Sequence, residues 1–283
     1  MAAHPLVLAT DLDGTFAGGT AADRSELVRH LRLARACLIY VTGRTPDSVH
    51  ELRERHQLPE PDVLIADVGT SVVAGSGPDR ITGIEDELDR LWPGTSAVAD
   101  RLAGISELDR QAVAAPRRVS YWIRTVRERA AANARDVQDP FAARGPGDNA
   151  LDAVSEELAA QAAALAGAAL ADLDVDILVS ANLFLDVLPR NVNKGTTLQR
   201  VLQWLDADVD RCVVAGDSLN DMPLFALGLR GIVVGNAEPA LSRDTAGMPL
   251  AYHARAHGAA GVLEGLRHHG HLLSQDQETS HGR

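Results

Sequence analysis

Two aspartates that follow a short apolar run are the first residues of this sequence that could carry out chemistry. Asp11 and Asp13 stand in the segment DLDGT, directly after the apolar residues 6–10. Because alternate side chains of an extended segment point to the same side, both carboxylates should face one site while Leu12 faces the core. Two carboxylates that face one site can bind a hard cation such as magnesium. Asp and Gly are also common in solvated turns, so a plain turn stays open for this segment taken alone.

Three later segments place polar groups at the ends of other apolar runs or at the start of a helix. They supply hydroxyl, amide and backbone N–H groups, an ammonium group and further carboxylates. Phosphoryl transfer requires this combination, because the phosphate needs donors and cations while a magnesium ion needs acids. The residues are Thr42, Gly43 and Arg44 in the first segment, Lys194 in the second, and Asp217, Asn220 and Asp221 in the third.

Lys194 stands out because of the composition of the whole chain. It is the single lysine among 27 basic residues, and all the others are arginine. Lysine in a chain that otherwise uses arginine indicates that this position needs a compact, strongly hydrated point charge and not a planar fork. Lys194 also opens a helix, where its ammonium would add to the positive helix N-terminus. We therefore expect Lys194 to contact a phosphate.

The elements that must position these residues alternate between short apolar strands and amphipathic helices. This alternation predicts an α/β fold with a doubly wound parallel sheet. In such a sheet ligands bind outside the carboxyl ends of the strands, where the polar segments lie. The expected strands cover residues 6–10, 37–42, 63–66, 185–189, 212–216 and 231–235, and the expected helices cover 23–36 and begin at Pro46, at Gly195 and after Asp221.

The sequence changes character between the two alternating blocks, which predicts an inserted second α/β domain. The insert holds a charged segment near its start, a strand-like run at 117–126, a turn-rich stretch at 139–149 and an alanine-rich helix near 152–171. We expect a core made of residues 1–82 and 186–268, an inserted domain at 83–185 and a disordered tail at 269–283.

Charge and composition narrow the classes of partner. The formal net charge of −12 argues against nucleic acid or an acidic membrane surface, because both require a basic face. No apolar run has the length of a membrane span, and the N-terminal segment lacks the basic residues of a secretion signal. Cys37 and Cys212 both lie in apolar stretches and are expected to be reduced thiols in the core. These features predict a cytoplasmic protein, and its oligomeric state stays open.

The segments DLDGT, TGR, NKG and GDSLND, in this order and at these positions, resemble the four motifs of the haloacid dehalogenase-like (HAD) phosphatases. The resemblance implies a phosphoric monoester hydrolase that uses Mg2+ and forms an aspartyl-phosphate. It implies that Asp11 is the nucleophile, and that Asp13 protonates the leaving oxygen and later activates water. It assigns the metal to Asp11, the main-chain oxygen of Asp13 and Asp217, supported by Asn220 and Asp221. It assigns the phosphate to Thr42 and Lys194, beside which Gly43, Arg44 and Asn220 are further candidates for substrate binding.

Longer segments resemble one branch of this superfamily, the sucrose-phosphate phosphatases. They are LIADVGTSV at 64–72, RRVSYWI at 117–123 and FLDVLPRNVNKGTTL at 184–198. The resemblance implies that the inserted domain is an α/β cap and that the substrate is a phosphorylated disaccharide or a sugar derivative of similar size, such as sucrose 6-phosphate. The cap region 127–172 does not match the family's sugar-binding positions. Other disaccharide, pseudo-disaccharide and glyceryl-sugar phosphates therefore stay open as substrates.

The strand-like run in the insert offers two different faces. If residues 117–126 are extended, Arg118, Ser120, Trp122 and Arg124 share one face, and the apolar residues between them share the other. We expect Arg118 and Trp122 to bind substrate, because donors beside an aromatic ring suit a sugar. The alternative is an edge strand whose arginines are solvated.

Two other functions stay open. A phosphosugar mutase of the same superfamily would keep both aspartates of DLDGT but would need a second phosphate site, which Arg117, Arg118 and Arg124 could provide. A non-catalytic sugar-phosphate-binding protein would keep the fold and lose the chemistry. The presence of every member of the expected constellation argues against the second alternative.

Overall fold

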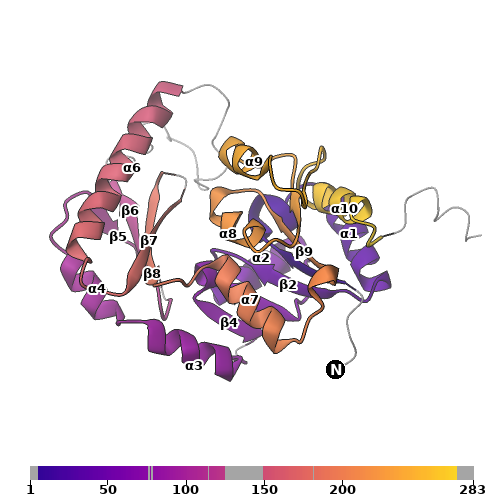
Figure 1. Ribbon diagram of the computed structural model, residues 1–283, viewed down its shortest axis with the longest axis horizontal. Coiled ribbons are helices and arrows are strands. Elements are labelled where there is room, and N and C mark those ends of the chain that lie inside the picture. Colours follow the sequence, from indigo (N-terminus) through magenta and orange to yellow (C-terminus); the bar gives the residue numbers. More distant parts are fainter. Residues whose placement is uncertain are drawn as a thin grey trace, which may run out of the picture. The chain divides into compact units, whose positions relative to one another are not determined.

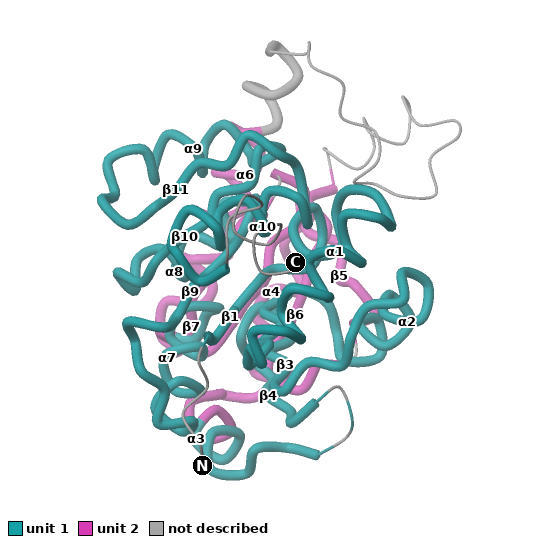
Figure 2. The backbone as a smooth tube through the Cα atoms, turned by 90° about the vertical axis from the view of Figure 1, so that its right-hand side faces the viewer, with its two compact units in different colours: residues 1–87, 192–283 teal, residues 88–191 magenta. Residues whose placement is uncertain are grey.

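The computed structural model describes residues 6–272 apart from 76, 78, 114, 125–148 and 181. It divides into two compact units, one made of residues 1–87 and 192–283 and the other of residues 88–191 (Figure 2). The division expected from the sequence placed these boundaries about five residues earlier. Nearly all of the turn-rich stretch 139–149 and most of the tail expected to be disordered lie outside the described residues.

The first unit contains a seven-stranded sheet with the order β11-β10-β9-β1-β2-β3-β4 (Figure 1). Every neighbouring pair is parallel except β3 and β4, which are antiparallel. This is the doubly wound α/β architecture expected from the alternation of strands and helices. Its strands are β1 (Val7–Thr10), β2 (Cys37–Val41), β3 (Val63–Ala66), β4 (Ser71–Ala74), β9 (Cys212–Gly216), β10 (Arg230–Val233) and β11 (Ala251–His253).

Helices cover both faces of this sheet. Ile232 of β10 contacts the helix α10, whereas the preceding residue, Gly231, lies against Phe225 of α8. Because successive strand residues point to opposite faces, α8 and α10 lie on opposite sides of the sheet. Helices α1 and α2 share the apolar cluster of α10. The helices of this unit are α1 (Ala21–Leu33), α2 (Pro46–His56), α7 (Lys194–Trp204), α8 (Met222–Phe225), α9 (Pro239–Thr245) and α10 (Gly258–His268), and α3 (Thr82–Leu91) crosses the boundary between the units.

Local sequence signals explain where the helices near the strand ends begin. Thr45 caps α2 by accepting the backbone N–H of Ser48, and Pro46 follows at the first helical position. Asn193 caps α7 by accepting the N–H groups of Gly195 and Thr196. Lys194 is therefore fixed as the first residue of α7.

The second unit is built on a four-stranded antiparallel sheet with the order β5-β6-β8-β7. The alanine-rich helix α6 and the helix α4 pack on the face that carries Val119, Tyr121 and Ile123. None of the described helices combines the length and apolar character that crossing a bilayer requires. The elements are α4 (Thr95–Leu102), β5 (Leu108–Arg110), β6 (Val119–Ile123), α6 (Asn149–Ala169), β7 (Val175–Ser180) and β8 (Phe184–Pro189).

Two expectations about strands are corrected here. The strand expected to open the second half of the core is β8, and it pairs with β6 and β7 in the sheet of the second unit. A short strand that is buried on both faces, as β8 is, has no periodicity that tells which sheet it joins, so the sequence could not decide this. The strand β6 lies between β5 and β8, so the alternative of an edge strand is wrong.

Candidate active site

The site lies where the strand order of the large sheet reverses. Strand β1 has β9 on one side and β2 on the other, and the chain continues outward in both directions. Because these strands are parallel, their carboxyl ends meet at one edge, which is where ligands bind in doubly wound sheets. This edge carries Asp11 after β1, Thr42 after β2 and Asp217 after β9.

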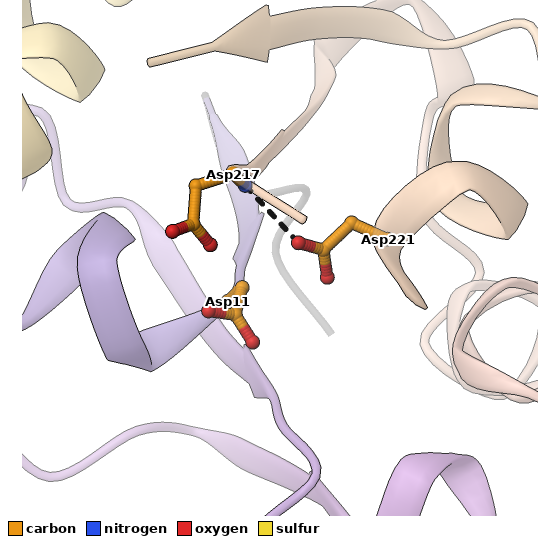
Figure 3. A group of neighbouring side chains, drawn as sticks. All are labelled: Asp11, Asp217 and Asp221. Carbon is orange, nitrogen blue, oxygen red and sulfur yellow. Dashed lines mark hydrogen bonds between the residues drawn. The ribbon is translucent and has the colours of Figure 1, made fainter. Parts of the chain in front are cut away.

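Three carboxylates come together at this edge. Asp11, Asp217 and Asp221 each offer an oxygen within 4.8 Å of the others. Figure 3 shows their side chains approaching from the end of β1 and from the segment after β9. Burial raises the pKa of Asp11 to about 7, and burial together with Asp11 and Asp221 raises the pKa of Asp217 to about 9. Crowded, buried carboxylate oxygens are the donors that magnesium prefers, so this set fits a divalent cation.

Lys194 contributes the positive charge of the cluster. Its buried Nζ donates hydrogen bonds to Asp11 Oδ1 at 2.7 Å, to Asn220 Oδ1 at 2.8 Å and to Asp221 Oδ1 at 2.6 Å. Burial alone would lower the pKa of Lys194, but the two carboxylates outweigh it and raise the pKa above its ordinary value. The ammonium is therefore charged and held in place beside Asp11.

Asp221 orders the segment that carries Asp217. Its Oδ2 accepts the backbone N–H groups of Asp217 and Ser218, both at 3.1 Å, while its Oδ1 accepts from Lys194. The side chain is fully buried. With both oxygens engaged, Asp221 is placed to orient Asp217 and Lys194 as well as to lie beside a cation.

Gly14 and Thr15 bring the DLDGT segment against Asp217. Thr15 Oγ1 donates to Asp217 Oδ1 at 3.2 Å. Gly14 has a φ of +74°, and a Cβ there would lie 2.1 Å from Asp217 Oδ2. Only glycine satisfies both the backbone conformation and the close approach.

Asp13 and Arg44 form a pair of their own. Arg44 donates from Nε to Asp13 Oδ2 at 2.6 Å and from Nη2 to Asp13 Oδ1 at 2.7 Å, and its Nη1 donates to Ser48 Oγ. The Asp13 side chain is about half exposed, and it is not one of the three clustered carboxylates. The expected general acid is thus held by a residue that was expected to contact the phosphate. Its main-chain oxygen as a metal ligand stays a prediction.

Thr42 and Gly43 connect the Asp13–Arg44 pair to the segment that follows β3. Thr42 is buried, and its Oγ1 accepts the backbone N–H of Arg44 at 3.2 Å. The carbonyl of Thr42 accepts the N–H of Val68 at 3.0 Å. A Cβ at Gly43 would only touch Val68, so the segment is close to its neighbours without being crowded.

Sequence reasoning overlooked residues at two further strand ends. After β3, Asp67 and Val68 have positive φ values of 52° and 61°, a strained conformation for a β-branched residue. After β10, Asn236 and Glu238 contact the segments that carry the acids. The rule that placed Asp11 at a strand end would have found both segments, because each directly follows an apolar run.

Arg118 and Trp122 belong to the second unit. Arg118 is buried, and its Nη1 lies 3.9 Å from Asp186 Oδ1, which also accepts a hydrogen bond from Ser120. The Trp122 ring packs 4.5 Å from that of Phe184, centroid to centroid. The expected division into two faces is present, but Arg118 is not solvated.

Known proteins resemble almost the whole chain. The family model of the sucrose-6F-phosphate phosphohydrolases matches residues 4–142 and 153–270. A sucrose-phosphatase from Synechocystis sp. PCC6803, solved with sucrose and phosphate, superposes with a TM-score of 0.74 at 26% identity, covering 96% of this chain and 100% of that one.

Two curated relatives are more similar in sequence. A glucosylglycerol-phosphate synthase from Pseudomonas anguilliseptica is 36% identical over 95% of this chain, which spans 31% of that protein's length. A mannosylfructose-phosphate phosphatase from Agrobacterium fabrum (strain C58) is 32% identical, covering 93% of this chain and 96% of the relative. The chain thus matches one relative from end to end and another over about a third of its length.

Proposed function

This chain belongs to the sucrose-6F-phosphate phosphohydrolase family, and we propose that it is a magnesium-dependent phosphatase acting on a glycoside phosphate of about disaccharide size. The observation that carries the proposal is the cluster of Asp11, Asp217 and Asp221 around Lys194, at the edge where the strand order reverses. It combines a nucleophile hydrogen-bonded to a fixed cation with three carboxylates whose oxygens lie within 4.8 Å of one another and could hold a metal ion.

Asp11 attacks phosphorus in this proposal. One of its oxygens forms a bond to phosphorus while the bond to the leaving sugar oxygen breaks, giving an aspartyl-phosphate. Lys194, already 2.7 Å from Asp11 Oδ1, orients the carboxylate and neutralises charge on the phosphate. Magnesium, held by Asp11, Asp217 and the main-chain oxygen of Asp13, would screen the phosphate from the attacking carboxylate.

Asp13 moves the protons. It donates one to the leaving sugar oxygen in the first step and takes one from water in the second, when water attacks phosphorus and releases Asp11. Arg44 holds both Asp13 oxygens, so Asp13 must exchange this guanidinium for the leaving oxygen. Arg44 therefore acts on the proton transfer as well as lying beside the phosphate.

The substrate class follows from what the relatives have in common. Two relatives are named for glucosylglycerol phosphate and mannosylfructose phosphate, and the structure of the third was solved with sucrose and phosphate. The three sugars each consist of a hexose joined to a second polyhydroxylated part, and two of them carry a phosphate. We place the substrate of this chain in that class and propose that Trp122 contacts its sugar.

Phosphate release from a panel of phosphorylated sugars tests the proposal. Sucrose 6-phosphate, glucosylglycerol phosphate and mannosylfructose phosphate are compared with glucose 6-phosphate, each with Mg2+ and with a chelator. We expect release that depends on Mg2+ and a higher kcat/KM for at least one glycoside phosphate than for glucose 6-phosphate. Full activity in chelator, or no release from any compound, would contradict it.

The three arginines that a mutase would need for a second phosphate all lie beside carboxylates, which argues against the mutase alternative. Arg117 pairs with Asp89 at 2.7 Å and Arg124 with Asp109 at 2.6 Å, while Arg118 lies beside Asp186. A carboxylate beside each arginine opposes binding of a second phosphate. Activity that rises on addition of a sugar bisphosphate would favour the mutase.

A further inference from the structure

The segment between β10 and α9 contacts both loops that carry the acids of the cluster. It belongs to none of the four motifs, and its side chains hold no position in the chemistry proposed above. Asn236 lies in this segment with an exposed side chain. Its Nδ2 donates to the carbonyl of Gly14 at 2.9 Å, and its Oδ1 accepts the backbone N–H of Gly258 at 2.8 Å.

An amide suits this position because it carries a donor and an acceptor on one planar group. The donor reaches the loop that follows Asp11, at the glycine that lies against Asp217. The acceptor reaches the first residue of α10, where a Cβ on Gly258 would lie 2.4 Å from the main chain of Gly18. Asn236 therefore ties the loop after β1 to a rigid helix start.

Glu238 makes the corresponding contacts to the other acidic loop. Its backbone N–H donates to the carbonyl of Asp217 at 2.7 Å. Its Oε2 accepts the backbone N–H of Leu219 at 3.0 Å. Glu238 directly precedes α9 and Pro239, so its backbone is fixed by the helix that follows.

We propose that Asn236 and Glu238 are positioning residues that set the separation of Asp11 and Asp217 and thereby the affinity of the site for a divalent cation. The inference rests on the proposed function, because it assumes that the clustered carboxylates bind a metal ion. Neither side chain contacts the cluster itself. Each acts through the main chain of an acidic loop, Asn236 through Gly14 and Glu238 through Leu219.

The test measures Mn2+ binding calorimetrically in the absence of substrate. Asn236→Ala and Glu238→Ala should each weaken Mn2+ binding about fivefold, the loss expected when a hydrogen bond that orders a ligand loop is removed. Glu238→Gln should bind nearly as the wild type, because glutamine keeps an acceptor for Leu219. Asp244→Ala removes an equal charge from an exposed position on α9 and should leave binding unchanged.

Activity on p-nitrophenyl phosphate provides a second readout. In both alanine variants, the rate should fall at low Mg2+ and recover toward the wild-type rate at saturating Mg2+. A merely structural role would lower the rate at every concentration. If Asn236→Ala also lowers the Tm, the inference is tested by comparing Mn2+ binding of Glu238→Ala with that of Glu238→Gln.

The outcomes separate this inference from the proposed function. If the wild-type protein binds no Mn2+ and releases no phosphate, both the proposed function and the inference are contradicted. Wild-type protein that binds and turns over, with alanine variants that bind Mn2+ equally well, would overturn the inference alone. Equal weakening in Asp244→Ala would reduce the effect of Glu238→Ala to net charge and would overturn the inference for Glu238.

Discussion

At the residue scale, the site balances buried carboxylates against one buried ammonium. Lys194 donates hydrogen bonds to Asp11, Asn220 and Asp221. Asp217 accepts from Thr15 instead, and burial together with the charges of Asp11 and Asp221 raises its pKa to about 9. The metal-free protein therefore carries carboxyl groups that resist ionisation. A divalent cation would relieve this by favouring their charged forms.

Stability should depend on pH in a direction fixed by these pKa values. Folded Asp11 and Asp217 hold protons up to pH values near 7 and 9, whereas an unfolded chain releases them near pH 4. The folded state thus binds more protons across this window, so the free energy of unfolding of metal-free protein should fall as pH rises from about 4 to 9. Mg2+ should raise the Tm more at pH 8 than at pH 5, and Asp217→Asn should raise the metal-free Tm at pH 8. Equal Mg2+ shifts at both pH values would refute this.

Lys194→Arg should be damaging although it keeps the charge. The ammonium is enclosed by acceptors 2.6 to 2.8 Å away, and a larger planar group cannot fit there without displacing Asp11 or Asp221. We expect a loss of at least about 100-fold in kcat and a cost of about 1–3 kcal/mol in stability. The measurements are steady-state kinetics and denaturant unfolding. Retention of more than about half the activity would show that charge alone is required.

Residue types at strand ends were enough to predict which side chains meet, but not all their pairings. Asp11 and Asp217 converge because parallel strands end at one edge, which the sequence pattern makes visible, whereas Lys194 reaches Asp11 from the start of α7. The pairing of Arg44 with Asp13 depends on side-chain directions beyond a turn, and no local pattern encodes these. The same limit applies to Arg118, which was expected to bind substrate and whose burial beside Asp186 was not predicted.

At the level of the elements, the loops after strands β1, β9 and β10 contact one another, and Gly14 lies at one of the tightest contacts. Gly14 requires a positive φ and leaves no space for a side chain beside Asp217. Gly14→Ala should therefore abolish measurable Mg2+-dependent activity by pushing the loop away from Asp217. Gly83→Ala is the matched control, since a Cβ there meets nothing within 4 Å and alanine favours the helix. Comparable activity in the two variants would contradict the close approach.

The order of helices and strands in the core could be read from the sequence because their apolar patterns are strong. The sheet to which β8 belongs could not be predicted, since a strand that is buried on both faces fits either sheet. The helix α6 was expected from its alanines, and its start at Asn149 came three residues earlier than expected. Helix boundaries depend on capping contacts that composition alone does not reveal.

At the scale of the whole molecule, the chemistry and the proposed recognition of sugar lie on different units. Trp122→Ala should raise the KM for the glycoside phosphate about tenfold and leave turnover of p-nitrophenyl phosphate unchanged, because only the larger substrate would contact the second unit. Arg118→Ala is a poorer probe, since it would leave the Asp186 carboxylate buried beside Ser120 alone. Trp204→Ala, at an exposed position on α7, is the control. Equal losses on both substrates would show that Trp122 does not recognise the sugar.

Chemical trapping can identify the nucleophile, on which the proposed phosphatase mechanism depends. The protein is quenched during turnover of p-nitrophenyl phosphate with Mg2+ and treated with borohydride, which reduces an aspartyl-phosphate to homoserine. Peptide mass spectrometry should then find homoserine at position 11, and neither metal-free protein nor Asp11→Asn, which should retain its fold and lose turnover, should show it. Homoserine at another aspartate, or continued turnover by Asp11→Asn, would contradict the account.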